Sequence, residues 1–200
     1  MTDHNITDKH KQRMQKLKEK VDARIDDATD EHGLLIVITG NGKGKSTSGF
    51  GTVARAVGHG LNAAVAQFIK GTWACGERKL LENAGVKFCV MGTGFTWNTQ
   101  DKDKDITAAK EVWLNCKTML ADNNLDVVLL DEMTYMLSYK YLDLDEVIEA
   151  LNNRPKHQHV IITGRACHRA IIELADTVSE VQSIKHAFDN GIKAQKGIDW

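Results

Sequence analysis

The residues best suited to chemistry lie together near the start of the chain, in the segment 39–47. It reads Thr-Gly-Asn-Gly-Lys-Gly-Lys-Ser-Thr. Small residues let successive backbone N–H groups turn inward around an anion, and a helix N-terminus adds unpaired donors and partial positive charge. Lys45 supplies a full positive charge, and the hydroxyl of Ser46 can bind Mg²⁺. The segment therefore predicts a phosphate-binding loop, or P-loop.

This loop departs from the strict G-x-x-x-x-G-K-[ST] pattern, because Thr39 stands where the first glycine belongs. Gly40 would serve only if the loop were one residue shorter. A glycine- and lysine-rich surface turn is the alternative. The flanking segments favour the P-loop, because residues 34–39 are an apolar run typical of a strand and residues 48–57 form an amphipathic helical pattern. Strand, loop and helix is the order that a P-loop requires.

A second group of candidates stands at the ends of two later apolar runs. Asp131 and Glu132 follow residues 126–130, as the Mg²⁺-binding acids of a Walker B element do. Arg165 follows residues 159–163 and Gly164. Because open α/β sheets bind ligands at the carboxyl ends of their strands, we expect these residues and the P-loop to meet at one edge of a sheet. The alternative is that the acids only begin a loop and that the arginine is solvated.

Two large aromatic residues stand in a segment that otherwise has the composition of a loop. Phe95 and Trp97 lie between Gly92 and Gln100, among glycines and polar residues. Loops run over the surface, so these rings need something to cover. They either fold back onto the core or form a flat apolar wall for a flat ligand.

The elements that must position these residues alternate along the chain. The sequence predicts strands at 34–39, 63–69, 86–91, 126–130, 159–163 and 178–184, separated by helices at 48–57, 77–83, 105–120, 144–151 and 168–175. Such alternation indicates right-handed βαβ units. The predicted fold class is α/β, a P-loop NTPase (RecA-like) with a mostly parallel sheet of about six strands flanked by helices.

An extra helix precedes this pattern. Met14, Leu17, Val21, Ile25 and Ala28 recur at gaps of three and four residues within 9–28. We expect residues 1–30 to form an N-terminal helical element and 31–200 the main domain. The helix could dock on its own core, cover a site or meet a partner subunit. At the other end, residues 185–200 are polar, and we expect Phe188, Ile192, Ile198 and Trp200 to hold them to the surface.

The composition of the chain gives no reason to expect a nucleic-acid-binding, membrane or secreted protein. The 200 residues carry a formal net charge of −1, which gives no electrostatic reason to expect nucleic acid or an anionic membrane. The apolar runs are far shorter than the roughly 20 residues that span a bilayer, and no signal-peptide pattern is present. The four cysteines show neither C-x-x-C nor zinc spacing, so reduced thiols in a cytoplasmic protein are the simplest account.

Reasoning from the residues alone leads to a protein that binds a nucleoside triphosphate with Mg²⁺, and to no particular reaction. A P-loop kinase or ATPase that uses Glu132 to orient a hydroxyl or water is one class. A non-catalytic nucleotide-binding module is another.

From about residue 20 to 200 the chain resembles the P-loop ATP:corrinoid adenosyltransferases of B12 synthesis and salvage. The matching motifs are Thr39 to Ser46, Arg55-Ala56-Val57-Gly58-His59-Gly60, Gln67-Phe68-Ile69-Lys70-Gly71, Gly94-Phe95-Thr96-Trp97, Leu130-Asp131-Glu132, Thr163-Gly164-Arg165 and Lys185-His186-Ala187-Phe188. That family's loop also lacks the strict first glycine. Ser46 is the visible departure, since the family often has threonine there, and both residues offer a hydroxyl.

The resemblance implies attack by a reduced Co(I) corrinoid on C5′ of ATP, with triphosphate as the leaving group. It implies Lys45, Phe95, Trp97 and Arg165 as catalytic residues, with Phe95 and Trp97 against the corrin and Arg165 on the triphosphate. Mg²⁺ would be held by Ser46 and Glu132, with Asp131 as a further candidate ligand. The ATP-binding set is Gly40, Asn41, Gly42, Lys43, Gly44, Lys45, Ser46, Thr47 and Arg165.

The resemblance also implies assembly and supply. The family is usually homodimeric, so the N-terminal helix would lid its own site or that of the neighbouring subunit. A reduced flavoprotein is the natural electron donor for making Co(I). The preferred corrinoid, a complete cobalamin or an early ring precursor, stays open, and neither nucleic acid nor membrane is an expected partner.

Overall fold

The structure is a computed structural model that describes residues 3–69, 75–92 and 101–199, with side chains from residue 8 onward. The chain divides into two compact units, residues 1–31 and residues 32–200. No helix in the described ranges is both long enough and apolar enough to cross a membrane.

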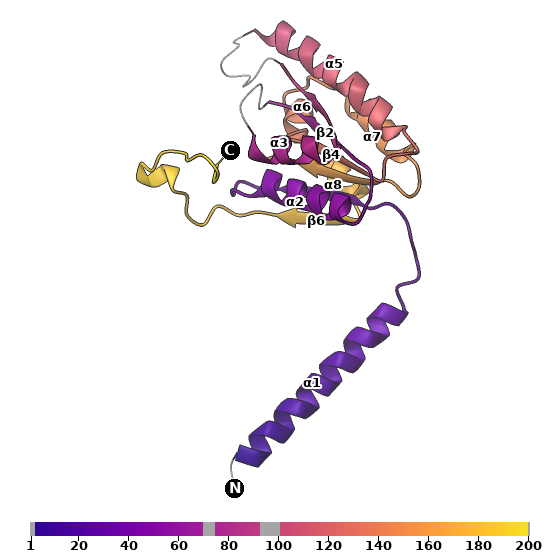
Figure 1. Cartoon of the computed structure of the whole chain (residues 1–200), viewed down its shortest axis with the longest axis vertical. Coiled ribbons are helices and arrows are strands. Elements are labelled where there is room, and N and C mark those ends of the chain that lie inside the picture. The colour runs from indigo at the N-terminus through magenta and orange to yellow at the C-terminus, as the bar shows by residue number, and fades with distance from the viewer. Residues whose placement is uncertain (1–2, 70–74, 93–100, 200) are drawn as a thin grey trace. The chain divides into compact units, whose positions relative to one another are not determined.

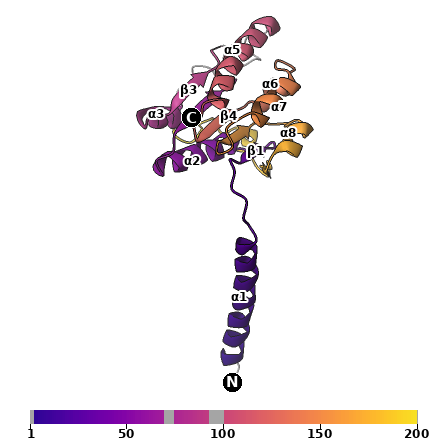
Figure 2. The same cartoon turned by 90° about the vertical axis from the view of Figure 1, so that its right-hand side faces the viewer.

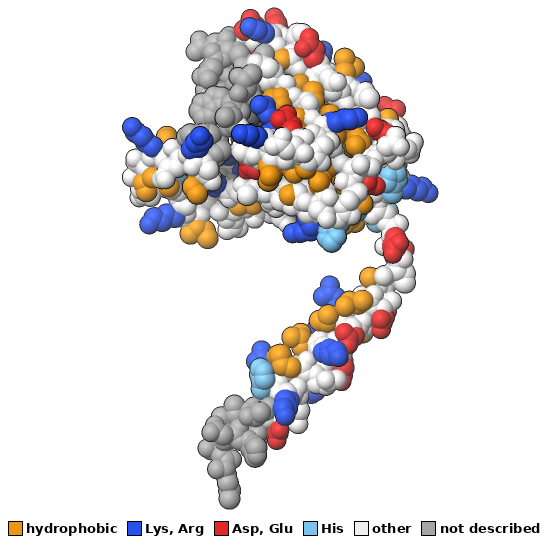
Figure 3. Space-filling model, viewed as in Figure 1, with side chains coloured by type: hydrophobic (Ala, Val, Ile, Leu, Met, Phe, Trp, Pro, Cys, Tyr) orange, Lys and Arg blue, Asp and Glu red, His pale blue; other side chains and the backbone are white. Residues whose placement is uncertain are grey.

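The first unit is a single helix, α1 (Asp3–Asp26). It begins earlier than the predicted residue 9. It ends before Ala28, so that residue does not extend its apolar stripe. The other stripe residues, Met14, Leu17, Val21 and Ile25, are exposed along one side of the helix (Figure 3).

The second unit contains a sheet of six parallel strands in the described residues. These are β1 (Leu35–Thr39), β2 (Ala63–Gln67), β3 (Lys87–Val90), β4 (Val127–Asp131), β5 (His159–Thr163) and β6 (Thr177–Glu180). Their order across the sheet is β3-β2-β4-β5-β1-β6 (Figure 1). Every residue of β2 and β4 is buried, which explains their continuous apolar runs. The parallel α/β fold predicted from sequence is confirmed.

Helices cover both faces of this sheet. Alternate residues of β4 belong to two apolar cores, because successive strand residues point to opposite faces. One core contains residues of α2 (Lys45–Gly58) and α3 (Gly76–Asn83). The other contains residues of α5 (Lys102–Leu120), α6 (Thr134–Ser138), α7 (Leu144–Asn152) and α8 (Arg169–Leu174). Figure 2 shows α2 and α3 on one side and α6, α7 and α8 on the other.

Beyond shifts of a few residues at the ends of several elements, the second unit differs from the sequence prediction in one unpredicted helix and one shortened strand. The five-residue helix α6 was not predicted, because it is too short to show a helical period. The last strand ends at Glu180 and not at residue 184, and all four of its residues are exposed because it forms an edge of the sheet.

The sheet order decides which loops meet. Strand β5 lies between β1 and β4, with Ile38 of β1 opposite Thr163 and Leu130 of β4 opposite Ile162. Because all three strands are parallel, their carboxyl ends lie side by side. The loop after β1, the acids after β4 and the glycine-arginine turn after β5 therefore share one edge.

Candidate functional site

The P-loop connects β1 directly to α2. Gly40 and Gly44 adopt left-handed backbone conformations, with φ of 98° and 115°, which glycine tolerates without strain. Helix α2 begins at Lys45, three residues before the predicted position, because Gly44 already serves as its N-cap. The first turn of α2 carries no acid. Its partial positive charge is therefore directed at the loop, as anion binding requires.

Lys45 lies within the loop, although it is charged. Its side chain is 7% exposed, and its Nζ donates a hydrogen bond to the carbonyl oxygen of Gly42 at 2.7 Å. Ser46 follows on the first turn of α2 and is partly exposed, while Asn41, Lys43 and Thr47 are exposed. A buried ammonium beside a helix N-terminus is a suitable partner for a phosphate.

The chain after β6 passes closely along this loop. The N–H of Gly42 donates to the carbonyl of Val181 at 2.7 Å, and the N–H of Val181 donates to the carbonyl of Thr39 at 2.8 Å. A Cβ on Gly40 would lie 2.5 Å from the Val181 oxygen, and one on Gly42 would lie 2.5 Å from the Gln182 oxygen. Thr39 itself pairs with Glu180 as a strand residue. The missing first glycine is thus explained, because this position still belongs to β1.

The C-terminal segment also contacts the loop by charge. Lys43 forms an ion pair with Asp199, and the N–H of Gln195 donates to the same carboxylate. These contacts lower the pKa of Asp199, the Lys43 hydrogen bond most strongly. The predicted apolar attachment is wrong, because Phe188 and Ile198 are each 74% exposed. Trp200 lies outside the described residues.

The two acids after β4 have different surroundings. Asp131 is fully buried, and its oxygens accept hydrogen bonds from Oγ1 of Thr163 at 2.7 Å and Nε2 of Gln67 at 3.3 Å. Glu132 is partly exposed and has a left-handed backbone with φ of 60°. Its N–H donates to Oγ1 of Thr163 at 2.9 Å. Asp131 is thus an internal residue, and Glu132 is the more accessible of the two acids, although its Oε2 atom is buried.

The turn after β5 fixes the backbone that carries Arg165. The hydroxyl of Thr134 donates to the carbonyl of Arg165 at 2.7 Å. Gly164 has φ of 136°, and a Cβ there would lie 2.1 Å from Oγ1 of Thr134. The Arg165 side chain is exposed, as a residue that binds an incoming anion must be. Its predicted place at the carboxyl edge of the sheet is confirmed.

Backbone strain is concentrated at this same edge. Ile69, Glu132 and Ala166 have φ of 55°, 60° and 49°, and they follow β2, β4 and β5. Non-glycine residues rarely adopt such values, and they do so most often at functional sites. Sequence reasoning did not assign roles to Thr163 and Gln67. The available signal was a polar side chain at the end of each of two apolar strands.

The pKa of Tyr135 on α6 is shifted by burial and by the charged residues at this edge. Burial raises the pKa of Tyr135, the nearby charge of Glu132 raises it further, and Arg165 opposes this shift. The Tyr135 ring lies 5.6 Å from that of Tyr139. The charges of Glu132 and Arg165 therefore both act on this tyrosine.

The structure describes the candidate metal-binding residues but not the two residues of the predicted aromatic wall. Phe95 and Trp97 lie outside the described residues. Within the described ranges, no group of three or more His, Cys, Asp or Glu side chains could enclose a metal ion. Mg²⁺ usually takes one or two protein carboxylates together with substrate phosphates and water. Ser46 and Glu132 fit that mode of binding, because both are partly exposed at one edge of the sheet.

The cysteines give no sign of chemistry. None of the four cysteines, all of which lie within the described residues, forms a disulfide. Burial raises the pKa of Cys116, and it raises the pKa of Cys167 to about 11, so both stay protonated and weakly reactive near neutral pH.

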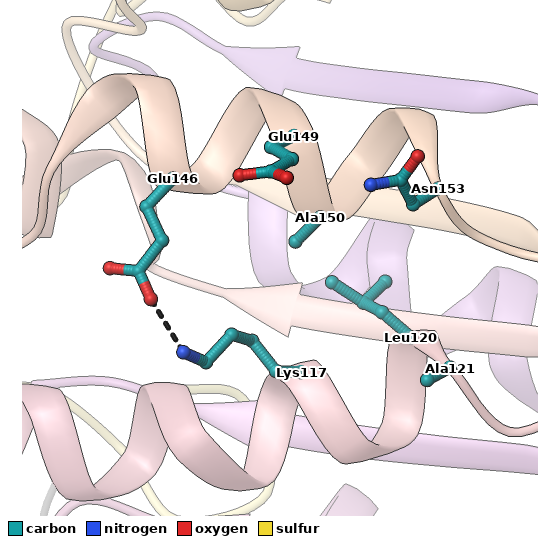
Figure 4. Close-up of a pocket in the computed structure, with 7 residues that line it drawn as sticks. All are labelled: Lys117, Leu120, Ala121, Glu146, Glu149, Ala150 and Asn153. Atoms are coloured by element: carbon teal, nitrogen blue, oxygen red, sulfur yellow. Dashed lines mark hydrogen bonds and ion pairs between the residues drawn. The ribbon is translucent and has the colours of Figure 1, made fainter.

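A separate cavity of about 320 Å³ lies between α5 and α7 (Figure 4). Lys117 reaches across it and pairs with Glu146, with Nζ and Oε1 2.5 Å apart. Glu149 adds a second carboxylate to the lining. The only cation in this lining is already paired with an acid, so the cavity does not suit a polyphosphate. The carboxyl edge of the sheet remains the candidate site.

Comparison with known proteins covers both units. Residues 31–200 match the family described as ATP:corrinoid adenosyltransferase BtuR/CobO/CobP, and residues 1–25 match the family described as cob(I)alamin adenosyltransferase N terminal. A corrinoid adenosyltransferase of Escherichia coli strain K12 is 63% identical over 96% of this chain and 98% of its own length. The corrinoid adenosyltransferase CobA of Salmonella typhimurium is 62% identical over the same shares. A corrinoid adenosyltransferase of Pseudomonas aeruginosa is 47% identical over 96% of each chain.

Proposed function

The chain belongs to the ATP:corrinoid adenosyltransferase family, and we propose that the residues at the carboxyl edge of its sheet carry out that family's reaction. The protein transfers the 5′-deoxyadenosyl group of ATP to the Co(I) of a reduced corrinoid, in the synthesis of adenosylcobalamin. The cobalt electron pair forms the Co–C5′ bond. The C5′–O5′ bond breaks, and its electron pair leaves with the triphosphate. Cobalt is thereby oxidised from Co(I) to Co(III).

This reaction needs no general base to activate the nucleophile, because Co(I) is already strongly nucleophilic. The demanding part is the departure of a highly charged triphosphate. Preorganised donors aimed at developing charge supply the largest share of many rate enhancements, and losing one typically costs about 10²–10³ in rate. The P-loop provides such donors, namely the ammonium of Lys45 and the backbone N–H groups of residues 40–46 other than that of Gly42, which donates to the Val181 carbonyl. The buried position of Lys45 beside the N-terminus of α2 supports this role.

Gly40, Gly42 and Gly44 allow the turns of the loop, and at Gly40 and Gly42 the missing Cβ makes room for the backbone of residues 181–182. Asn41, Lys43 and Thr47 are exposed in and beside the loop. Arg165, exposed on the neighbouring turn, would contact the triphosphate from the β5 side. Its planar guanidinium pairs with phosphate oxygens in a bidentate manner.

Mg²⁺ would be held by the Ser46 hydroxyl and the Glu132 carboxylate, with further oxygens from ATP and water. When bound, it neutralises charge on the polyphosphate. Asp131 is the weaker candidate for a direct ligand, because it is fully buried and already accepts hydrogen bonds from Thr163 and Gln67. Glu132 is therefore our choice of the two acids.

Phe95 and Trp97 would pack against the corrin and disfavour a lower axial ligand, since an apolar wall excludes a polar fifth ligand from cobalt. A four-coordinate corrinoid is easier to reduce to Co(I). We extend the proposal to α1 as a lid, to a homodimer, to a reduced flavoprotein as electron donor and to the cytoplasm as the place of action. The exposed stripe of Met14, Leu17, Val21 and Ile25 supports a covering role for α1.

The observation that carries this proposal is the match over nearly the whole chain, with 63% identity across both units. The test is an anaerobic reaction of the purified protein with ATP, Mg²⁺ and chemically reduced cob(I)alamin. We expect adenosylcobalamin with one triphosphate per product. ADP or phosphate without a new cobalt–carbon bond would place the chain among kinases or ATPases, and ATP binding without turnover would indicate a nucleotide-binding module.

The roles of Phe95 and Trp97 need their own experiment. We expect Phe95→Ala and Trp97→Ala to change the absorption spectrum of the bound Co(II) corrinoid, because a fifth ligand returns to cobalt. Their rates with free Co(I) substrate serve as the comparison. If neither the spectrum nor the rate changes, the aromatic wall plays no part.

A further inference from the structure

One hydroxyl group lies at the centre of the carboxyl edge. Thr163, the last residue of β5, is fully buried, and its Oγ1 accepts a hydrogen bond from the N–H of Glu132 at 2.9 Å. The same oxygen donates its proton to Oδ1 of Asp131 at 2.7 Å. A hydroxyl has one proton to give and two lone pairs, so it can fill both roles at once. Thr163 thus holds the backbone of one acid and the side chain of the other.

The methyl group of Thr163 contacts the other half of the site. A Cβ added to Gly49 of α2 would lie 3.1 Å from Cγ2 of Thr163, so the helix that begins with Lys45 packs directly on this residue. Strand β5 also separates β1 from β4 in the sheet. One side chain therefore touches both the P-loop helix and the acids.

Glu132 needs support of this kind because its backbone is left-handed, with φ of 60°. Such a conformation persists only where the surroundings hold it in place. The hydrogen bond to Thr163 is one restraint, and the turn at Gly164 lies beside the carboxylate, since a Cβ there would be in van der Waals contact with Oε2 at 3.4 Å. The orientation of the Glu132 peptide limits where its carboxylate can reach.

We propose that Thr163 is a positioning residue for the metal-binding acid: its hydroxyl fixes the Glu132 peptide and the Asp131 carboxylate together, and it does not itself touch ATP, corrinoid or metal. This inference rests on the proposed function, because it takes Glu132 as a ligand of Mg²⁺. Hydrogen-bonding partners of metal ligands typically change metal affinity or activity about 10–100-fold when they are removed.

The experiment separates the hydroxyl from the methyl. Thr163→Val keeps the shape and loses the hydroxyl, whereas Thr163→Ser keeps the hydroxyl and loses the contact with Gly49. Calorimetry measures the affinity of each full-length protein for ATP in EDTA and for ATP with excess Mn²⁺. The ratio of these affinities is the contribution of the metal. We expect Thr163→Val to lower the ratio about tenfold, without changing the affinity for metal-free ATP, and Thr163→Ser to keep the wild-type ratio.

A matched control addresses general destabilisation. Gln158 is fully buried at the opposite end of β5, where its Nε2 donates to backbone carbonyls of Met119, Asp122 and Leu125. Gln158→Leu should lower the melting temperature and leave the Mn²⁺ ratio unchanged. If Thr163→Val does not fold, Thr163→Ala is compared with Thr163→Ser, since both lack the methyl contact and only serine keeps the hydroxyl.

The proposal is overturned if the valine and serine proteins have the same ratio, or if the wild-type ratio shows no contribution from Mn²⁺. These titrations need no corrinoid, so they are independent of the anaerobic assay. If the wild-type protein makes no adenosylcobalamin and Thr163→Val lowers the Mn²⁺ ratio, the proposed function is refuted and the positioning role is supported. If the wild-type protein makes adenosylcobalamin and Thr163→Val leaves the ratio unchanged, the function is supported and the positioning role is refuted.

Discussion

Replacing Gly42 with alanine tests whether the chain after β6 completes the P-loop. The added Cβ would lie 2.5 Å from the Gln182 oxygen, 2.7 Å from its carbonyl carbon and 2.8 Å from the Val181 oxygen. All three are backbone atoms, so no side-chain rotation can relieve the contact. The segment after β6 must move away, and the 2.7 Å hydrogen bond from Gly42 to Val181 is lost with it.

The cost follows from these two effects. A lost intramolecular hydrogen bond is worth about 1 kcal/mol, and forcing extra volume into a packed contact costs about 1–3 kcal/mol. Gly42→Ala should therefore lower the free energy of unfolding by about 2–4 kcal/mol. For a chain of this length that corresponds to a melting temperature lower by about 5–15 °C. Affinity for ATP should fall too, because the carbonyl of Gly42 holds Nζ of Lys45.

Thermal unfolding followed by circular dichroism, with and without ATP, measures both effects. Gly51→Ala is the matched control, since Gly51 lies on α2 and a Cβ there meets no atom within 4 Å. Alanine is favoured over glycine inside a helix by about 1 kcal/mol, so this variant should melt at or slightly above the wild-type temperature. If Gly42→Ala melts like Gly51→Ala and binds ATP normally, the tail does not shape the loop.

Three further predictions concern charged residues. Lys45→Ala should reduce kcat by about 10²–10³-fold, because a donor to the leaving triphosphate is lost. The P-loop assignment is refuted if this variant has both the wild-type rate and the wild-type affinity for ATP by calorimetry. Asp199→Asn should tighten ATP binding by no more than about fivefold, because Lys43 is then available to phosphate; a weaker affinity would mean that Asp199 assists binding. The N–H of Leu35 and then the His32 side chain lower the pKa of Asp176 from its ordinary value of 3.8. This carboxylate therefore stabilises the fold above pH 4 and loses its contribution as the pH falls below that value. The difference in melting temperature between Asp176→Asn and wild type should therefore be smaller below pH 4 than at pH 5, and an unchanged difference would contradict this role.

Much of the fold could be predicted because its signals are local. Continuous apolar runs such as residues 126–130 mark strands buried on both faces, and the glycine-rich segment before Lys45 marks the loop. The order of the strands could not be predicted in the same way. It depends on pairings such as Val37 with Ile162, which join residues far apart in the chain. The convergence on one edge followed only from the general rule for parallel sheets.

The site shows the same division. The charged side chains of Lys45, Glu132 and Arg165 predicted a site for anions and a metal ion. The structure places all three at the carboxyl edge of the sheet. The only signal for Thr163 was a polar side chain at the end of an apolar strand, because its hydroxyl contacts Asp131 and Glu132 at the end of another strand. Likewise, apolar residues in the last segment suggested packing, whereas an ion pair between Lys43 and Asp199 makes the contact. Polar contacts between distant segments leave no periodic pattern in a sequence.

The position of β1 in the sheet has a consequence for the biosynthesis of the protein. Strand β1 is made first, yet its two neighbours, β5 and β6, are made last. Until both have left the ribosome, the strand that precedes the P-loop has two unpaired edges. Unpaired edges can form hydrogen bonds with strands of other chains and cause aggregation. Contacts between residues far apart in the chain also form slowly. We therefore expect nascent chains that stop before residue 177 to bind no ATP and to depend on chaperones, so that nucleotide binding begins only when nearly the whole chain has been made.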